Sequence, residues 1–105
     1  MMNFQKMMQQ AQNMQFKLQE MQEKLGEIQV EGESGGGLVK VVMTCKGDTI
    51  SLSIDPSLMD DKETMEDLVV AAFNNAHGAK EERIKVETQD MMKDMGLPEG
   101  TQLPI

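Results

Sequence analysis

Few side chains in this sequence of 105 residues could carry out chemistry. It contains one histidine, His77, and one cysteine, Cys45. A protein zinc site draws on several such ligands, so we expect no metal site. No nucleophile, base and oxyanion-binding group occur together in a pattern typical of an active site. We therefore predict a protein that is not an enzyme and has no cofactor and no small-molecule substrate.

Three other features have structural explanations. Cys45 alternates with the apolar residues of an expected strand, which favours a buried, unreactive thiol. The glycine run 35–37 is not followed by the Gly-Lys-Ser/Thr of a phosphate loop, and a strand rather than a helix comes next, so we interpret it as a hairpin loop. Asp60 and Glu63 are placed to cap the start of a helix rather than to bind a cation.

The positive charges are more informative, because their distribution is uneven. The net charge is −8, which argues against general nucleic-acid binding by the whole surface. Residues 1–19, however, contain two lysines, no Asp or Glu, and many amide side chains that can donate to phosphate oxygens. The charge distribution alone does not distinguish a DNA contact from a solvated polar face. The candidate DNA contacts are Lys6, Gln10, Asn13, Lys17 and Lys24, with Lys40 and Lys46 as a possible secondary contact.

The first element that must position these side chains is a helix over residues 3–28. Apolar residues occupy two series spaced by seven, which is the heptad pattern of a helix that packs on a partner. The series are Phe4, Ala11, Leu18 and Leu25, and Met7, Met14, Met21 and Ile28. We expect residues 18–28 to pack on the body and on a second copy of the chain. The segment 1–28 forms the projecting helix, and its N-terminal half is expected to extend away from the body.

A sheet region follows over residues 29–55. Short runs near Val30, over 38–45 and over 50–54 are typical of strands, and Lys46-Gly47-Asp48 is typical of a tight turn. Ile50, Leu52 and Ile54 alternate with polar residues, which indicates a half-buried strand. The prediction is a three-stranded antiparallel meander.

A second helix is predicted over residues 60–95, with Gly78 weakening or bending it, and an extended tail over 96–105. The fold class is α+β with the order α-β-β-β-α, in one domain spanning 1–105. The residues predicted to form the core or a dimer interface are Leu18, Met21, Leu25, Val39, Val41, Ile50, Leu52, Ile54, Leu68 and Phe73.

The location follows from what the sequence lacks. No apolar run is long enough to span a membrane, and the polar N-terminus is unlike a signal peptide. A single cysteine fits a reducing compartment. We expect a cytoplasmic protein. The absence of Trp and Tyr disfavours base stacking, so DNA contact should be to the backbone and largely independent of sequence.

Four segments also match a known family in order. They are Gly-Glu-Ser-Gly-Gly-Gly-Leu-Val-Lys-Val at 32–41, Ile-Asp-Pro-Ser-Leu at 54–58, Glu-Asp-Leu-Val-Val-Ala-Ala-Phe-Asn at 66–74 and Leu-Pro-Ile at 103–105. The chain resembles the YbaB/EbfC family of bacterial nucleoid-associated proteins. This resemblance implies a tweezer-like homodimer in the nucleoid whose first helices project. It also implies that duplex DNA is bound with little or loose sequence specificity and changed in conformation, with effects on nucleoid organisation and gene expression.

Two alternatives remain open. Twelve methionines and two long helices around a hairpin are also similar to prefoldin-type subunits, which favours a coiled-coil, chaperone-like scaffold with no direct DNA binding. A structural subunit of a larger assembly is the other alternative. Phe16 lies opposite the heptad stripe and could cover a neighbouring chain, contact another partner or wedge into DNA.

Overall fold

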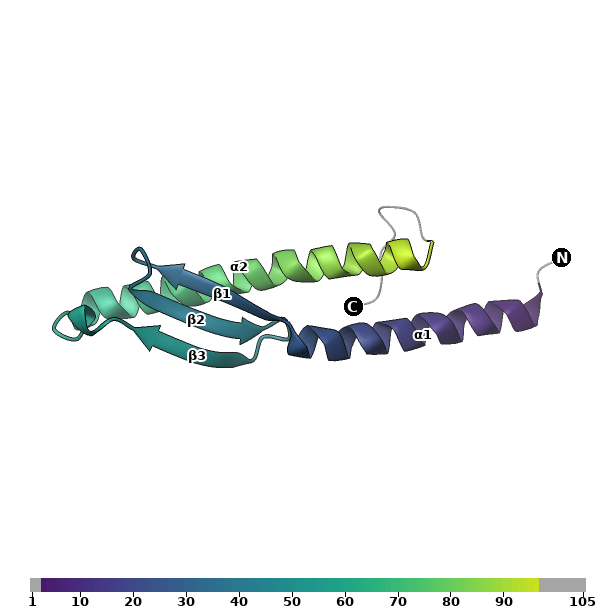
Figure 1. The fold of residues 1–105 in the computed structure, drawn as a ribbon, viewed down its shortest axis with the longest axis horizontal. Coiled ribbons are helices and arrows are strands. Elements are labelled where there is room, and N and C mark those ends of the chain that lie inside the picture. Colours follow the sequence, from purple (N-terminus) through teal and green to yellow (C-terminus); the bar gives the residue numbers. More distant parts are fainter. Residues whose placement is uncertain (1–2, 97–105) are drawn as a thin grey trace.

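The computed structural model describes residues 3–96 and contains two long helices and one sheet (Figure 1). The elements in order are α1 (Phe4–Glu27), β1 (Gln29–Ser34), β2 (Val39–Thr44), β3 (Thr49–Ile54), a short 3₁₀ helix η1 (Pro56–Leu58) and α2 (Lys62–Asp94). All three strands form one antiparallel sheet in the order β1-β2-β3. The predicted α-β-β-β-α fold class is confirmed.

The first helix, α1, begins and ends within a residue of its predicted limits. Its cap is Asn3, whose side-chain oxygen accepts a hydrogen bond from the backbone N–H of Gln5 at 3.1 Å. At the other end, Ile28 takes an extended conformation and the chain passes directly into β1. With 24 residues, α1 is roughly 36 Å long.

The sheet places its apolar residues on the face that α2 covers (Figure 1). On β2, Val39, Val41 and Met43 are fully buried against this helix. Val41 pairs with Gly32 on β1 and with Leu52 on β3, so these three residues share the face. The glycine run 35–37 forms the β1–β2 turn with positive φ angles, as the hairpin interpretation predicted.

The start of α2 corrects one prediction. The cap is Asp61 rather than Asp60, and its partner is Thr64 rather than Glu63. One carboxylate oxygen of Asp61 accepts from the Thr64 backbone N–H at 3.2 Å, and the other accepts from the Thr64 hydroxyl at 2.7 Å. Thr64 is the third residue of the helix, which is where a cap finds its backbone donor. Beyond it α2 runs as one continuous helix through Gly78 to Asp94, close to the predicted end at residue 95.

The core consists of two clusters. The larger one joins β2 to α2 through Val39, Val41, Met43, Leu58, Ala72 and Ala76. The smaller one joins α1 to the body through Met21, Leu25, Cys45 and Met91. The thiol of Cys45 is free and buried, as expected.

The predicted core residues fall into three groups. Met21, Leu25, Val39 and Val41 are buried, and Leu18, Ile54, Leu68 and Phe73 are partly buried. Ile50 and Leu52 are 50% and 46% exposed in the single chain, so they lie outside its core and stay a prediction for the dimer interface. The physical reason is that α2 packs on β1 and β2, which leaves β3 at an uncovered edge.

The molecule is strongly elongated. Its extents are 72 × 22 × 17 Å, and its radius of gyration is 19.3 Å, whereas a compact domain of this length has about 13 Å. Figure 1 shows why: α1 runs beside the end of α2 and then continues past it. In the single chain, the N-terminal half of α1 therefore extends beyond the other described elements. The predicted extended tail falls almost wholly on residues 97–105, outside the described part of the chain.

Candidate nucleic-acid interface

The five predicted DNA contacts on α1 form one stripe. Lys6, Gln10, Asn13, Lys17 and Lys24 follow one another at spacings of four, three, four and seven residues within a single helix. Because such spacings return to the same side of an α-helix, the side chains share a face. The rest of the fold divides this face into a free outer part and an inner part that faces α2.

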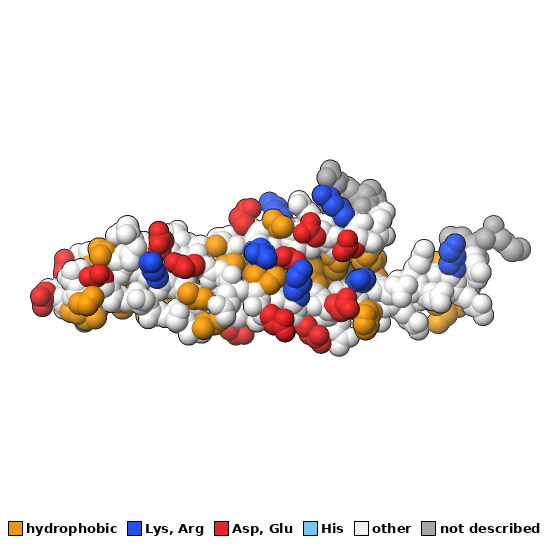
Figure 2. All heavy atoms as spheres, in the orientation of Figure 1, with side chains coloured by type: hydrophobic (Ala, Val, Ile, Leu, Met, Phe, Trp, Pro, Cys, Tyr) orange, Lys and Arg blue, Asp and Glu red, His pale blue; other side chains and the backbone are white. Residues whose placement is uncertain are grey.

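The outer part belongs to the projecting end of α1. Lys6 is exposed there, and among residues 3–96 it has no carboxylate within ion-pair distance. Figure 2 shows one basic side chain and no acidic ones over this end of the molecule in that view. The nearby apolar side chains are also unpacked, with exposed fractions of 74% for Phe4 and 62% for Phe16.

Midway along α1 the stripe enters a crevice between the two helices. Gln10, Asn13 and Lys17 line a cavity of about 410 Å³ whose opposite wall includes Asp94 and Met95. The Lys17 ammonium lies 3.8 Å from a carboxylate oxygen of Glu20 on its own helix. Both of these side chains are about half exposed, so this pair is weak and can exchange for another anion.

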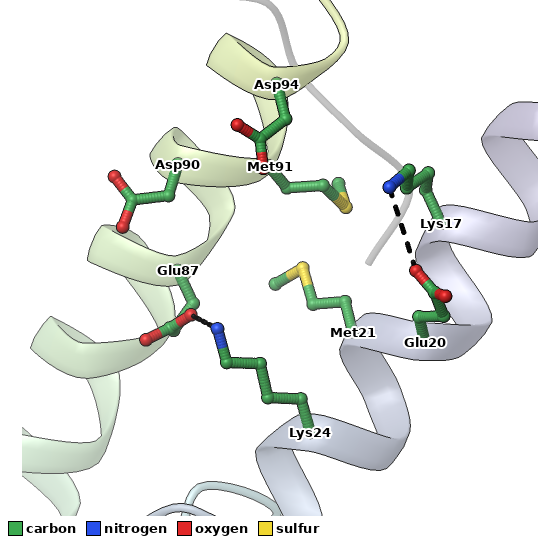
Figure 3. Close-up of a pocket in the computed structure, with 8 residues that line it drawn as sticks. All are labelled: Lys17, Glu20, Met21, Lys24, Glu87, Asp90, Met91 and Asp94. Carbon is green, nitrogen blue, oxygen red and sulfur yellow. Dashed lines mark ion pairs between the residues drawn. The ribbon is translucent and has the colours of Figure 1, made fainter.

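The inner end of the stripe is occupied by an interhelical ion pair (Figure 3). The Lys24 ammonium lies 2.7 Å from one carboxylate oxygen of Glu87 on α2, and the other oxygen accepts from Arg83 Nε at 3.1 Å. Glu87 is only 8% exposed. Met21 and Met91 fill the space beside the pair, between the helices (Figure 3).

These contacts perturb the ionisation of the pair in the directions expected for opposite charges. The hydrogen bond from Lys24 holds the pKa of Glu87 below its ordinary value, and Arg83 adds to the effect although burial opposes it. The hydrogen bond to Glu87 in turn raises the pKa of Lys24. Both groups are therefore charged at neutral pH, and a DNA phosphate would have to compete with Glu87 for Lys24.

The possible secondary contact is not a single patch. Lys40 lies near the start of β2, on the sheet face opposite α2, whereas Lys46 lies in the turn beyond the end of β2. The two are separated by about the length of a six-residue strand, roughly 20 Å. Lys46 instead approaches the C-terminal end of α1, where its side chain comes close to Gly26.

Two charged residues at the α1–α2 junction were missed from the sequence. Glu87 pairs with Lys24 and is itself held by Arg83, although Lys24 and Glu87 are 63 positions apart in the sequence. The only available signal was the spacing of four between Arg83 and Glu87, which occurs on many solvated helix faces. Within the described residues, no group of three or more His, Cys, Asp or Glu side chains is arranged to hold a metal ion. Neither helix there is long and apolar enough to cross a membrane.

Both the sequence and the fold are similar to those of known proteins. Residues 1–95 match the model of the YbaB/EbfC DNA-binding family. Among solved structures, the uncharacterized protein HP0035 from Helicobacter pylori is similar, with a TM-score of 0.76 and 30% sequence identity. The match covers 88% of this chain and 99% of that chain. The two chains therefore share one fold over almost the full length of the H. pylori chain.

Proposed function

The chain belongs to the YbaB/EbfC DNA-binding family, and from that premise we propose how it binds. It acts as a homodimer that contacts the backbone of duplex DNA with the projecting ends of two α1 helices. The binding has little sequence preference and changes the conformation of the DNA, which in turn affects nucleoid organisation and gene expression.

One observation carries the proposal: the part of α1 that projects from the body is the part without carboxylates. Residues 1–19 have a charge of +2 from Lys6 and Lys17, whereas residues 20–105 have −10. Projection keeps Lys6 away from the acidic body, which would otherwise repel a polyanion. Lys6, Gln10, Asn13 and Lys17 are the proposed contacts, with Lys6 contributing most because it is exposed and has no ion-pair partner in the described part of the chain.

The second copy is proposed because one chain leaves apolar surface uncovered. The strand β3 is an edge strand without a charged residue, and Ile50 and Leu52 are exposed on it. Edge strands of monomers are usually protected by charges or by a covering element. An uncharged strip is also where two copies of a chain with a net charge of −8 can approach with least repulsion. The projecting, carboxylate-free part of α1, residues 4–19, is called the arm below. A dimer would carry four arm lysines in place of two.

Salt-dependent binding to a fluorescent duplex tests the DNA proposal. Four phosphate contacts predict that the logarithm of affinity falls with the logarithm of salt concentration at a slope of about −4. Lys6→Glu with Lys17→Glu should abolish binding while the protein still dimerises. The charge-matched control is Lys62→Glu with Lys85→Glu, two exposed positions on α2, and it should retain most of the affinity. Normal binding by the arm variant would refute the proposed contacts.

A chaperone-like scaffold remains the second candidate, and the exposed apolar residues of the arm favour it. Phe4, Met7, Met8 and Phe16 are all exposed in the single chain, and flexible methionines suit a variable protein partner. If the protein never retards duplex DNA at low salt but keeps an unfolded client soluble, this candidate replaces the first. Phe4→Ser with Phe16→Ser should then reduce client protection.

A further inference from the structure

Glu87 is the one acidic residue of α2 that is buried where the two helices meet. Its carboxylate is 8% exposed, and each of its oxygens has one cationic partner. Lys24 comes from α1 and Arg83 from the preceding turn of α2. Glu87 therefore connects the arm to the body, in addition to the apolar contact between Met21 and Met91.

The arrangement is poorly suited to stabilising α2 alone. A helical pair spaced by four is most favourable with the acid first, and here Arg83 precedes Glu87. The pairs of Glu87 also add little net stability, because the Lys24 and Arg83 side chains are 60% and 48% exposed and therefore screened by water, while burying the Glu87 carboxylate is costly. What Arg83 does achieve is to hold one carboxylate oxygen, so that the other is directed at α1. This geometry orients a partner helix.

The other contacts between α1 and the body are apolar, and they do not impose a specific direction as an ion pair does. They extend from Leu25 through Met21 to Leu18, which is only partly buried, and N-terminal to Leu18 no residue of α1 in the described part of the chain is buried. Near the junction, the backbone N–H of Cys45 donates to the Leu25 and Ile28 carbonyls, which anchors the end of α1 but leaves its tilt free. The Lys24–Glu87 contact lies one turn farther toward the arm, where it can resist tilting.

We propose that Glu87 is a positioning residue for DNA binding, which clamps α1 against α2 through Lys24 and so sets the direction in which the arm projects. Lys24 is then a part of the clamp rather than a phosphate contact. This positioning role rests on the proposed DNA-binding function. The clamp itself acts in the free protein, so the direction of the arm can be measured without DNA.

The direct test measures, in the absence of DNA, how widely the position of the arm varies relative to α2. Spin labels are placed at Gln12 on α1 and Gln89 on α2, both exposed, in a background in which Cys45 is replaced by alanine. Labelled chains are diluted with unlabelled protein so that pulsed electron paramagnetic resonance reports distances within one chain. Glu87→Gln should broaden the distance distribution, and Lys24→Met should broaden it in the same way without altering α2.

Matched controls separate clamping from loss of a charge. Glu66→Gln removes the same charge from an exposed pair near the start of α2, and Lys24→Arg keeps a cation at the clamp. Both should leave the distribution narrow. If Glu87→Gln and Lys24→Met lower the melting temperature but leave a distribution as narrow as that of the unaltered protein, the pair is merely stabilising and the proposal is refuted.

DNA affinity provides a second test, because loss of a negative charge and loss of the clamp change it in opposite directions. Removing a negative charge alone should tighten DNA binding, as expected for Glu66→Gln. The Glu87→Gln variant should instead bind DNA about five-fold more weakly or worse, because the clamp is lost. A change of this size is within the usual range for coupling between sites. Tighter binding by Glu87→Gln would overturn the positioning role. If the unaltered protein binds no DNA, the proposed function fails while the distance measurement still decides whether the clamp exists.

Discussion

Gly32 on β1 lies directly against the backbone of Ala76 on α2. A Cβ atom built at Gly32 would be 2.2 Å from the Ala76 nitrogen and 2.4 Å from the Ala72 carbonyl oxygen. No side-chain rotation can relieve a contact with backbone atoms. The fold therefore depends on having small residues at this crossing: glycine on the strand, and alanines one turn apart on the helix.

Substituting Gly32 with alanine should consequently destabilise the protein strongly. Overpacking typically costs about 1–3 kcal/mol, and we expect a loss of about 3 kcal/mol in the free energy of unfolding because backbone must move. The matched control is Gly78→Ala, where a Cβ meets nothing within 4 Å inside α2. It should gain about 0.5–1 kcal/mol from helix propensity. Equal effects of the two substitutions in chemical denaturation would contradict this account.

A second prediction concerns the uncovered strand β3. Ile50→Lys with Leu52→Lys should leave the fold intact, because both side chains are already exposed in the single chain. It should nevertheless dissociate the proposed dimer, since two copies would then bring like charges together. Light scattering after size exclusion measures the mass. The control is Val70→Lys, an exposed apolar position on α2. A double variant that keeps the dimer mass would exclude β3 as the interface.

A third prediction uses the two adjacent aspartates before α2. Asp61→Ala should lower the melting temperature, because it removes the acceptor for both Thr64 donors and leaves the first helical turn uncapped. Asp60→Ala removes the same charge next to it and should have a much smaller effect. The reverse ranking in thermal unfolding would mean that the helix starts at Asp60 after all.

A fourth prediction follows from the lowered pKa of Glu87. A carboxyl group whose pKa falls on folding, here below 4.5, stabilises the folded state above its unfolded pKa. That stabilisation is lost as the pH falls through the folded pKa. The difference in unfolding free energy between the unaltered protein and Glu87→Gln should therefore be largest near neutral pH and shrink below about pH 4.

The control for this pH dependence is Glu66→Gln, because the Lys62–Glu66 pair is exposed on both sides and should contribute little at any pH. Unfolding by denaturant at neutral and acidic pH measures both differences. A Glu87→Gln difference that stays constant or grows on acidification would show that the charge of Glu87 does not stabilise the fold.

Periodicity in the sequence was sufficient to determine the elements. The heptad series predicts α1 to within a residue of its observed limits, and alternation predicts β2 and β3, whereas β1 was predicted only as a shorter run near Val30. These patterns are reliable because they reflect backbone geometry, which repeats locally. Periodicity does not identify the cap of α2, because Asp60 and Asp61 are adjacent and chemically equivalent. Only the positions of the Thr64 donors in the folded chain distinguish the two aspartates.

For the candidate interface, the sequence determined that Lys6, Gln10, Asn13, Lys17 and Lys24 share a stripe on one helix, whose first half has no carboxylates. Only the tertiary structure decided what lies opposite each of them. It leaves Lys6 without an ion-pair partner among residues 3–96, places Lys17 beside the carboxylate-bearing end of α2 and pairs Lys24 with Glu87. It likewise leaves Ile50 and Leu52 uncovered. A periodic pattern specifies which side chains share a face, but what that face meets depends on the packing of segments distant in sequence.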